Sequence, residues 1–299
     1  MTGKRPFFLN AFPPHDRRER FDTTADLLRL GAEAKSGLFA HTLFTVGLKR
    51  LDPWVLAQRA MGSERELRPL IAVNPLLQKP QCVAGALSAL ADLYQRPLAV
   101  NLIAGSFYRE HLALGDERSF QEKGEALRKF YHELKSLMDP GIDLRYFVSG
   151  YGHEDFAREE DTFTVKSLRP LPLEEKLGPR CGYLVGLCAR ETQEEARTAV
   201  RDLFPEDRYG KWMREMGQGN EMTPWNSFLR EMARKGVNDH YHLGPLESFW
   251  SPAPFVVGSY DDVAGVLSEY VKSGAGFFIV DFHPKDFSHV AEVLGRLLS

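Results

Sequence analysis

Short apolar runs alternate with amphipathic stretches along most of the chain. Continuous apolar runs are typical of buried parallel strands, and the helical spacing between them indicates the crossover helices that parallel strands need. The pattern predicts eight strands, at residues 6–10, 38–44, 70–73, 98–103, 146–148, 162–165, 182–188 and 276–281. Helices are predicted after an N-cap at 22–24 and at 53–60, 81–94, 120–138 and 287–298. This repeat predicts the α/β class and a (β/α)8 TIM barrel.

One segment does not follow the alternation of strand and helix patterns. Residues 204–254 are rich in Met, Trp, Arg and Gly and are too long for an ordinary loop, although a helix is predicted near 224–235. Elsewhere the chain has no linker or shift of composition that would mark a domain boundary. We therefore expect a single barrel domain over 1–299, with 204–254 as an insertion, or lid, before the last strand.

Composition and charge exclude several classes of protein. The 38 Lys and Arg residues nearly balance the 41 Asp and Glu residues, so the net charge is −3. Such a chain has no overall field that would attract nucleic acid or an anionic membrane. No apolar run approaches the roughly 20 residues that span a bilayer, and the first residues lack the pattern of a signal peptide. We expect a cytoplasmic protein without nucleic-acid or membrane partners.

Cysteine and histidine positions give little support for a metal site. Cys82, Cys181 and Cys188 are too few and too widely spaced for a disulfide framework, and we expect reduced core residues. His240 and His242 flank one residue, as metal ligands in a barrel hydrolase can. They fall in the irregular segment and have no further ligands at evident spacing, so we expect no metal.

Candidate catalytic residues follow from the barrel itself, because chemistry in such barrels lies at the C-terminal ends of the strands. His283 follows the last predicted strand and could act as a general acid or base near neutral pH, or be a loop residue bonded to Asp281 or solvent. His41 is a second catalytic candidate, although a shift of one residue in register would turn it away from the mouth. His15 is a weaker one. The other residues expected at the mouth are Asn10, Thr45, Asn74, Asn101, Gly105, Ser149, Thr164 and Asp281.

Blocks of sequence, in their order and spacing, resemble the bacterial luciferase-like, flavin-dependent monooxygenases, and within them the alkanesulfonate monooxygenase branch. The blocks are 67–75, 90–105, 147–152, 188–196, 257–264 and 274–280. The resemblance spans nearly the whole chain. It implies a luciferase-like barrel that binds FMN, or a deazaflavin as in some branches, and often forms a homodimer. The monooxygenases use O2 and reduced FMN that a separate flavin reductase supplies, and the cofactor carries the hard chemistry.

The resemblance also implies where a flavin would bind. Asn101 matches an Asn of the fourth strand, whose amide can donate to and accept from the edge of the isoalloxazine ring, and Asn74 is a second candidate. Both could instead cap the loops that follow their strands. The turn Ser149, Gly150, Tyr151 and Gly152 offers backbone N–H groups for the phosphate, although Tyr151 and Gly152 replace hydroxyl residues of the family.

Several catalytic positions of the alkanesulfonate branch are changed. Its Arg and His on one strand fall at Leu184 and Gly186, and its late Tyr falls at His283. A Cys near its N-terminus aligns with Arg50, and the Arg of its mobile loop has no counterpart in 249–251. Without an Arg clamp a sulfonate would lose charge-assisted hydrogen bonds, so alkanesulfonate is a poor candidate substrate.

These features predict a flavin-dependent monooxygenase that oxidises a small or medium organic molecule. The alternative is a non-catalytic or specialised flavin-binding relative that serves as a binding or assembly partner. Apolar residues of the insertion could cover a flavin or substrate, pack internally or form a dimer interface. They are Trp212, Met213, Met216, Met222, Trp225, Phe249 and Trp250.

Overall fold

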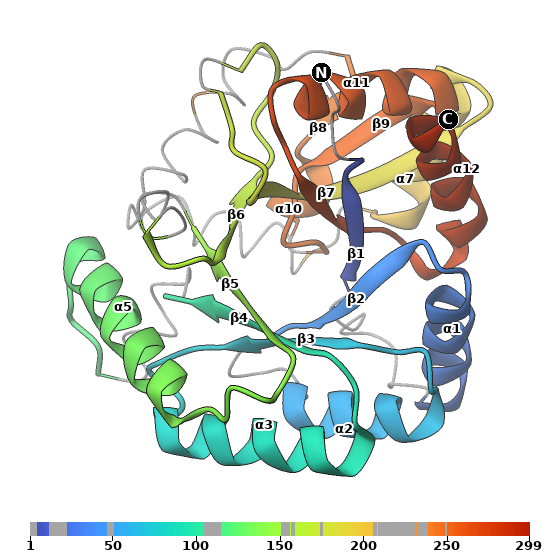
Figure 1. Ribbon diagram of the computed structural model, residues 1–299. Coiled ribbons are helices and arrows are strands. Elements are labelled where there is room, and N and C mark those ends of the chain that lie inside the picture. The colour runs from blue at the N-terminus through green and yellow to red at the C-terminus, as the bar shows by residue number, and fades with distance from the viewer. Residues whose placement is uncertain are drawn as a thin grey trace. The chain divides into compact units, whose positions relative to one another are not determined.

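The structure is a computed structural model in which strands and helices alternate along the chain (Figure 1). It describes residues 5–11, 23–46, 51–104, 115–150, 156, 159–173, 176–205, 208, 231, 239–248 and 250–299. The contacts between residues divide the chain into two compact units. The first unit comprises Met1–Arg20 and Lys166–Ser299, and the second comprises Phe21–Val165.

The second unit contains a parallel sheet whose strands follow one another in chain order. Its strands are β2 (Phe39–Phe44), β3 (Pro69–Val73), β4 (Leu98–Ile103), β5 (Leu144–Ser149) and the start of β6 (Phe163–Ser167). Every residue of β3 is buried. These strands lie within about two residues of their predicted positions, because continuous apolar runs mark strands that are covered on both faces.

Four helices belong to this unit, namely α1 (Thr23–Lys35), α2 (Pro53–Ser63), α3 (Pro80–Tyr94) and α5 (Phe120–Leu137). Asp52 caps α2 by accepting hydrogen bonds from the backbone N–H groups of Trp54 and Val55. Ser119 and Glu122 form a reciprocal capping box at the start of α5. These side chains satisfy N–H groups that have no partner within the helix.

Arg96 lies in the turn between α3 and β4, and its side chain binds the end of α2. Its guanidinium donates to the backbone carbonyls of Met61, Glu64, Arg65 and Leu67 over 2.6–3.1 Å. The last carbonyls of a helix lack partners within it, and a cation there also complements the helix dipole. One side chain therefore fastens α2, the start of β3 and the start of β4 together.

The first unit contains a second set of strands, in the order β1 (Phe7–Ala11), β10 (Phe277–Asp281), β7 (Cys181–Arg190) and β9 (Phe255–Ser259), all parallel. The long strand β7 pairs with β10 through its first half and with β9 through its second half. The short strand β8 (Tyr241–His242) pairs antiparallel with β9. The sequence analysis missed both β8 and β9.

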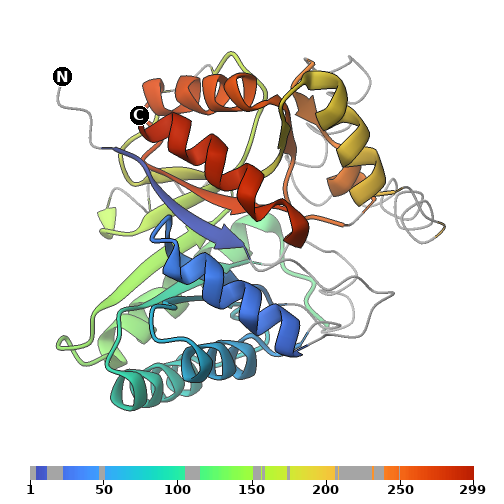
Figure 2. The same cartoon turned by 90° about the vertical axis from the view of Figure 1, so that its right-hand side faces the viewer.

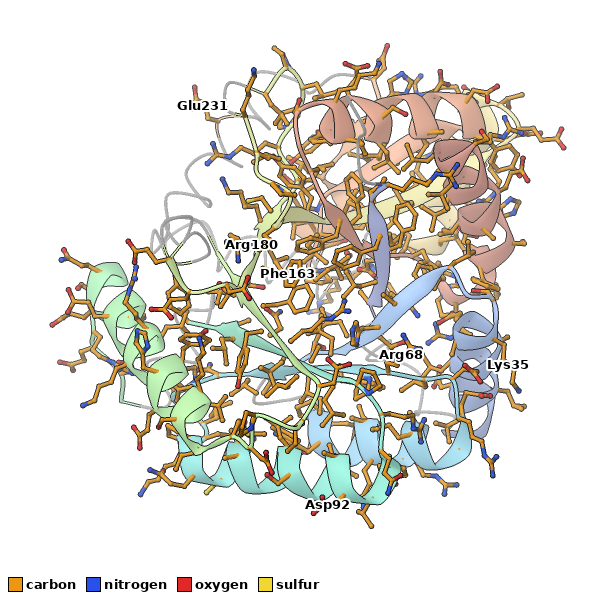
Figure 3. The ribbon with its side chains drawn as sticks, in the orientation of Figure 1. Lys35, Arg68, Asp92, Phe163, Arg180 and Glu231 are labelled. Atoms are coloured by element: carbon orange, nitrogen blue, oxygen red, sulfur yellow. The ribbon has the colours of Figure 1, made fainter. Side chains whose placement is uncertain are left out.

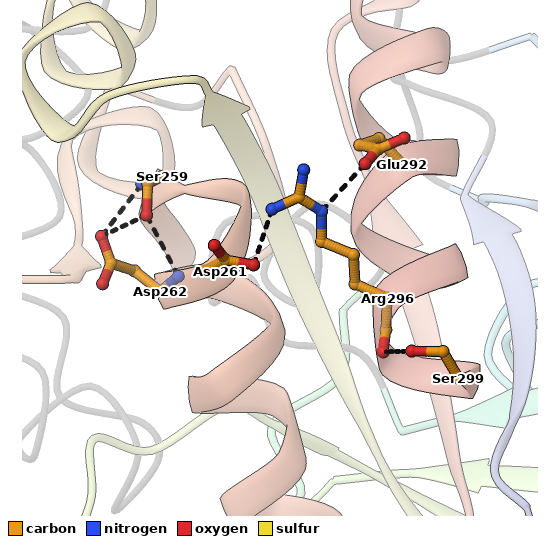
Figure 4. A network of polar contacts seen from close by, with 6 residues as sticks. All are labelled: Ser259, Asp261, Asp262, Glu292, Arg296 and Ser299. Carbon is orange, nitrogen blue, oxygen red and sulfur yellow. Dashed lines mark hydrogen bonds and ion pairs between the residues drawn. The ribbon is translucent and has the colours of Figure 1, made fainter.

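The helices of this unit are α7 (Gln193–Leu203), α10 (Gly244–Glu247), α11 (Tyr260–Lys272) and α12 (Phe287–Leu298), with a 3-10 turn at Pro284–Asp286. Helices α11 and α12 lie side by side (Figure 2). Arg296 of α12 bonds to Asp261 of α11 at 2.6 Å and to Glu292 at 2.8 Å (Figure 4). Because these pairs are exposed, each contributes little to stability.

The predicted fold class is confirmed, since the chain has the eight-stranded parallel α/β barrel fold with helices between its strands. The eight predicted strands correspond to β1 through β7 and β10. The single domain and the lid over 204–254 stay predictions. Most of that segment lies outside the described residues, and its described part is not wholly irregular, because it holds β8 and α10. No helix of the described ranges is both long and apolar enough to cross a membrane.

Candidate active site

Asn101 and Ser149 form a polar pair at the C-terminal ends of β4 and β5. Tyr146 packs edge-on against Tyr131 of α5, with ring centroids 5.1 Å apart, so Tyr146 faces the helix. Side chains alternate along a strand, and Ser149 therefore faces the other side of the sheet. There its hydroxyl donates to the Oδ1 atom of Asn101 at 2.8 Å. The bond orients the Asn101 carboxamide and leaves its NH2 group to donate elsewhere.

Two stacked rings lie beside this pair. Phe147 is the register neighbour of both Asn101 and Phe163. The rings of Phe147 and Phe163 stack, with their centroids 4.8 Å apart and their planes 20° from parallel. Phe163 is labelled in Figure 3. Asn101 is only 4% exposed. Hydrogen bonds are stronger in such apolar surroundings, so the arrangement can hold a flat, polar-edged ring.

Asn74 is held in a local turn after β3. Its Oδ1 atom accepts the backbone N–H of Leu76 at 2.9 Å, and its carbonyl accepts the N–H of Leu77 at 2.9 Å. This is the loop-capping role that the sequence left open for Asn74. Within the described part of the chain, no hydrogen bond joins Asn74 to Asn101. A role of Asn74 at a cofactor stays a prediction, and only its NH2 group is left for it.

The turn predicted to hold a phosphate is described only at its start. Gly150 has φ +130°, a conformation that favours glycine. Its N–H donates to the carbonyl of Val165 at 3.0 Å, and the hydroxyl of Ser149 is already bonded to Asn101. Neither donor is therefore free for an anion. Tyr151 and Gly152 lie outside the described residues, and their role stays a prediction.

His41 shares a face of the sheet with Asn101 but lies near the opposite end. The side chain of Leu43 neighbours that of Leu70, and Ala72 neighbours Asn101, so His41 alternates onto the same face. It lies about four residues nearer the N-terminal ends of the strands, or roughly 13 Å along them. The structure does not bring this catalytic candidate to the C-terminal end of the unit's strands.

The first unit carries its own polar group at the end of β10. The hydroxyl of Ser251 donates to Oδ2 of Asp281 at 2.5 Å and accepts the N–H of Ala253 at 3.0 Å. Both side chains are buried. His283 follows two residues after Asp281 and is half-buried. Its Nδ1 atom accepts the backbone N–H of Lys285 at 3.3 Å, so the neutral ring carries its proton on Nε2.

Aromatic rings occupy the space beside Gly186, where the alkanesulfonate branch has one of its Arg and His pair. A Cβ atom at this position would lie 2.0 Å from the ring of Phe255. Phe255 packs against Cys188 and the α7 residues Ala196 and Val200. Phe204 meets Phe255 edge-on at 5.0 Å and His283 at 5.8 Å. No larger side chain fits at Gly186 unless Phe255 moves.

Near the end of β7, the charged side chains of Arg190 and Asp286 pair with each other. Arg190 bonds to both carboxylate oxygens of the buried Asp286 at 2.8 and 3.2 Å. Burial raises the pKa of the Cys188 thiol to about 12, and the charge of Asp286 adds to this. Cys188 is therefore an unreactive core residue, as expected. Cys82 is exposed on α3, so the expectation that it packs in the core is wrong.

The histidines considered as metal ligands have other contacts. His240 Nδ1 lies 3.3 Å from the carbonyl of Val257, and Asp239 is paired with Arg197 at 3.1 Å. Burial lowers the pKa of His242. Within the described residues, no three His, Cys, Asp or Glu side chains are arranged to hold a metal ion.

The remaining predicted residues lie on several strands or outside the described part of the chain, and some residues of the site were not predicted. Asn10 and Thr164 are buried on β1 and β6, and Thr45 follows β2. His15, Arg50, Gly105 and most apolar residues of the insertion lie outside the described residues. Sequence analysis missed Ser251, Phe163 and Phe204. No local motif marks them, because their contacts join positions far apart in the chain.

Comparisons with known proteins show what this chain resembles in sequence and in fold. No family model matches the chain. A curated relative, the 4-(γ-L-glutamylamino)butanoyl-[BtrI acyl-carrier protein] monooxygenase of Niallia circulans, is 25% identical, over 98% of this chain and 92% of its own length.

Solved structures share the fold over nearly the whole chain. The oxygenating constituent of 3,6-diketocamphane monooxygenase from Pseudomonas putida, solved with FMN, has a TM-score of 0.68 at 13% identity, over 99% of this chain and 98% of that one. An F420-dependent secondary alcohol dehydrogenase has a TM-score of 0.63 at 10% identity, over 99% and 98%. On these grounds the chain is an oxidoreductase with the barrel fold of the luciferase-like monooxygenases.

Proposed function

We propose that this chain is the oxygenase component of a two-component flavin-dependent monooxygenase. A separate reductase supplies it with reduced FMN, and it uses O2 to oxidise a small or medium organic molecule. The observation that carries the proposal is the Asn101 and Ser149 pair beside the stacked rings of Phe147 and Phe163. The sequence likeness to a monooxygenase over nearly the whole chain supports it.

The described residues fit the edge of a flavin ring. That edge alternates donors and acceptors, and a carboxamide offers both. Because Ser149 donates to Oδ1 of Asn101, the NH2 group is the part of Asn101 that would bind a ring acceptor. Bound flavin would supply the redox chemistry with O2. The chain's own contribution is to orient the ring and to surround it with apolar groups that exclude water.

His283 is the group that we assign to proton transfer. The Lys285 N–H fixes the Nε2–H tautomer of the neutral ring, which makes Nε2 the atom that can donate a proton. The edge of Phe204 restricts the orientation of the ring. His41 is not included, because it lies near the other end of the strands.

The substrate site differs from one that binds a sulfonate. Phe255 occupies the space beside Gly186, and Arg190 is engaged by Asp286. Both features favour an uncharged or apolar reacting group over an anion. A second candidate is an acyl group carried on an acyl-carrier protein, as the name of the Niallia circulans relative specifies for that enzyme. The cytoplasmic location and homodimer inferred from sequence stay predictions.

A flavin titration tests the proposal. We would follow absorbance and fluorescence of the full chain with oxidised FMN, with anaerobically reduced FMN, and with the deazaflavin F420. Saturable binding of reduced FMN should weaken at least about tenfold in Asn101→Ala, the cost of one or more hydrogen bonds in an apolar site. Gln58→Ala, which removes an exposed amide on α2, is the matched control and should bind normally.

Other results would redirect or end the proposal. Tighter binding of F420 than of FMN would make the chain a deazaflavin enzyme. Failure to bind any flavin would contradict catalysis of this kind and favour the non-catalytic alternative. With flavin bound, product formation from candidate substrates in the presence of a reductase and O2 distinguishes a monooxygenase from a flavin-binding protein.

A further inference from the structure

His41 is a buried polar side chain with an unsatisfied ring nitrogen. It is 3% exposed, and its Nδ1 atom has no hydrogen-bond partner among the residues that the structure describes. The carbonyl of Pro69 acts as an acceptor for the imidazole ring. A neutral ring with its proton toward Pro69 leaves a bare lone pair on Nδ1. Buried polar atoms are seldom left without a partner, so this one needs an explanation.

Two arginines surround His41 with positive charge. Arg145 of β5 has the same strand alternation as Phe147 and Ser149, so its side chain shares the face on which His41 lies. Arg68, which is labelled in Figure 3, immediately precedes β3, and its carbonyl accepts the N–H of Thr42 at 2.9 Å. Both guanidinium groups act on His41 electrostatically.

These two arginines have no acidic partner in the described part of the chain. Among the residues that the structure describes, neither Arg68 nor Arg145 forms an ion pair, and no carboxylate contributes to the field at His41. Both arginine side chains are exposed, whereas the less exposed Arg190 and Arg29 are paired with Asp286 and Glu33. The two charges that act on His41 are therefore both positive.

We propose that His41, Arg68 and Arg145 bind an oxyanion, and that the best ligand is a phosphate group that carries a proton. The two guanidinium groups donate to its charged oxygens in charge-assisted hydrogen bonds. Its hydroxyl donates to the lone pair of His41 Nδ1. A phosphate near neutral pH offers both features, because its second pKa is about 6 to 7, whereas a carboxylate offers only acceptors.

This site is separate from the flavin site. His41 and Asn101 lie on one face of the same sheet but roughly 13 Å apart along the strands. The inference does not depend on the proposed function. The chain can bind phosphate here whether or not it binds flavin.

Calorimetric titration of the full chain with inorganic phosphate tests the site, at pH 7 and at constant ionic strength in chloride. Saturable binding should weaken at least about tenfold in Arg145→Gln and in Arg68→Gln, since each loses a charge-assisted hydrogen bond. Arg59→Gln is the matched control, because Arg59 is an exposed arginine of α2 in the same unit. It should bind phosphate like the unchanged chain.

Acetate and His41→Leu separate the two kinds of oxyanion. His41→Leu should weaken phosphate binding and leave acetate binding unchanged, because acetate at pH 7 has no hydroxyl to donate. In the unchanged chain, phosphate should also shift the Nδ1 resonance of His41. Equal affinity for acetate and phosphate would overturn the role of His41. Absence of saturation, or equal weakening in Arg59→Gln and Arg145→Gln, would overturn the site as a whole and indicate unspecific attraction.

Discussion

In the second unit, a buried polar pair at the C-terminal ends of the strands differs from a buried histidine toward their N-terminal ends. At the C-terminal ends of the strands, the amide oxygen of Asn101 and the hydroxyl of Ser149 satisfy each other. Toward the N-terminal ends, His41 has an unpartnered nitrogen in the field of two arginines. The contrast shows that the Ser149 hydroxyl and the Asn101 amide oxygen are paired within the protein, whereas burial of His41 is tolerated only while its ring is uncharged.

The largest expected effect is an acid sensitivity that originates at His41. Burial, with a smaller contribution from Arg145, lowers its pKa from 6.5 to about 4. Above pH 6.5 the ring is neutral in both folded and unfolded chains. As the pH falls from 6.5 toward 4, only the unfolded chain binds this proton. The free energy of unfolding should therefore decrease, by roughly 3 kcal/mol in total.

Urea denaturation at several pH values in chloride buffer measures this loss. His41→Leu should lack the His41 contribution, so the difference between the two curves should grow as the pH falls. Parallel curves for the two proteins from pH 7 to pH 4.5 would refute the contrast between the two ends.

The next largest effect is the loss of stability when the hydrogen bond between Ser149 and Asn101 is removed. Asn101→Ala leaves the Ser149 hydroxyl without its partner and should lower the free energy of unfolding by about 2 kcal/mol. Ser149→Ala should lower the free energy of unfolding by less, because the side chain of Ser149 is more exposed than that of Asn101. The double variant should cost less than the sum of the single ones, with a coupling of about 1 kcal/mol. Strict additivity in this double-mutant cycle would show that the pair contributes no mutual stabilisation.

The smallest expected effect is a change in the pKa of His41 when one of the two arginines near it is removed. Arg145→Gln removes one of the two positive charges near His41, and the pKa of His41 should rise. It should stay below 6.5, because burial is the larger cause of the depression. NMR titration of the imidazole measures the shift, with Arg59→Gln as the control. An unchanged pKa in Arg145→Gln would show that burial acts alone.

The elements were largely predictable because apolar periodicity is a local property. The strand 98–103 and the helix 287–298 agree with the structure at both ends. Phe255–Ser259 was missed because its strand is defined by pairing with the second half of β7, about seventy residues earlier, and sequence periodicity does not record pairing.

The candidate site was predictable only in part. Asn101 follows from its place on a predicted strand, and Asp281 and His283 follow from theirs. The partner of Asn101 is 48 residues away, and that of Asp281 is 30 residues away. His41 was assigned to the mouth because the sequence does not give the stagger between strands. That stagger decides which end of the sheet a residue reaches.

Arg96 gives the second unit a property that single helices lack. Its four carbonyl contacts join the end of α2 to the segments that begin β3 and β4, although these are far apart in the chain. The last turn of α2 cannot fray unless this guanidinium is released. In hydrogen exchange, the amides of these segments should consequently open as one cooperative group, with a shared protection that an isolated helix end does not have.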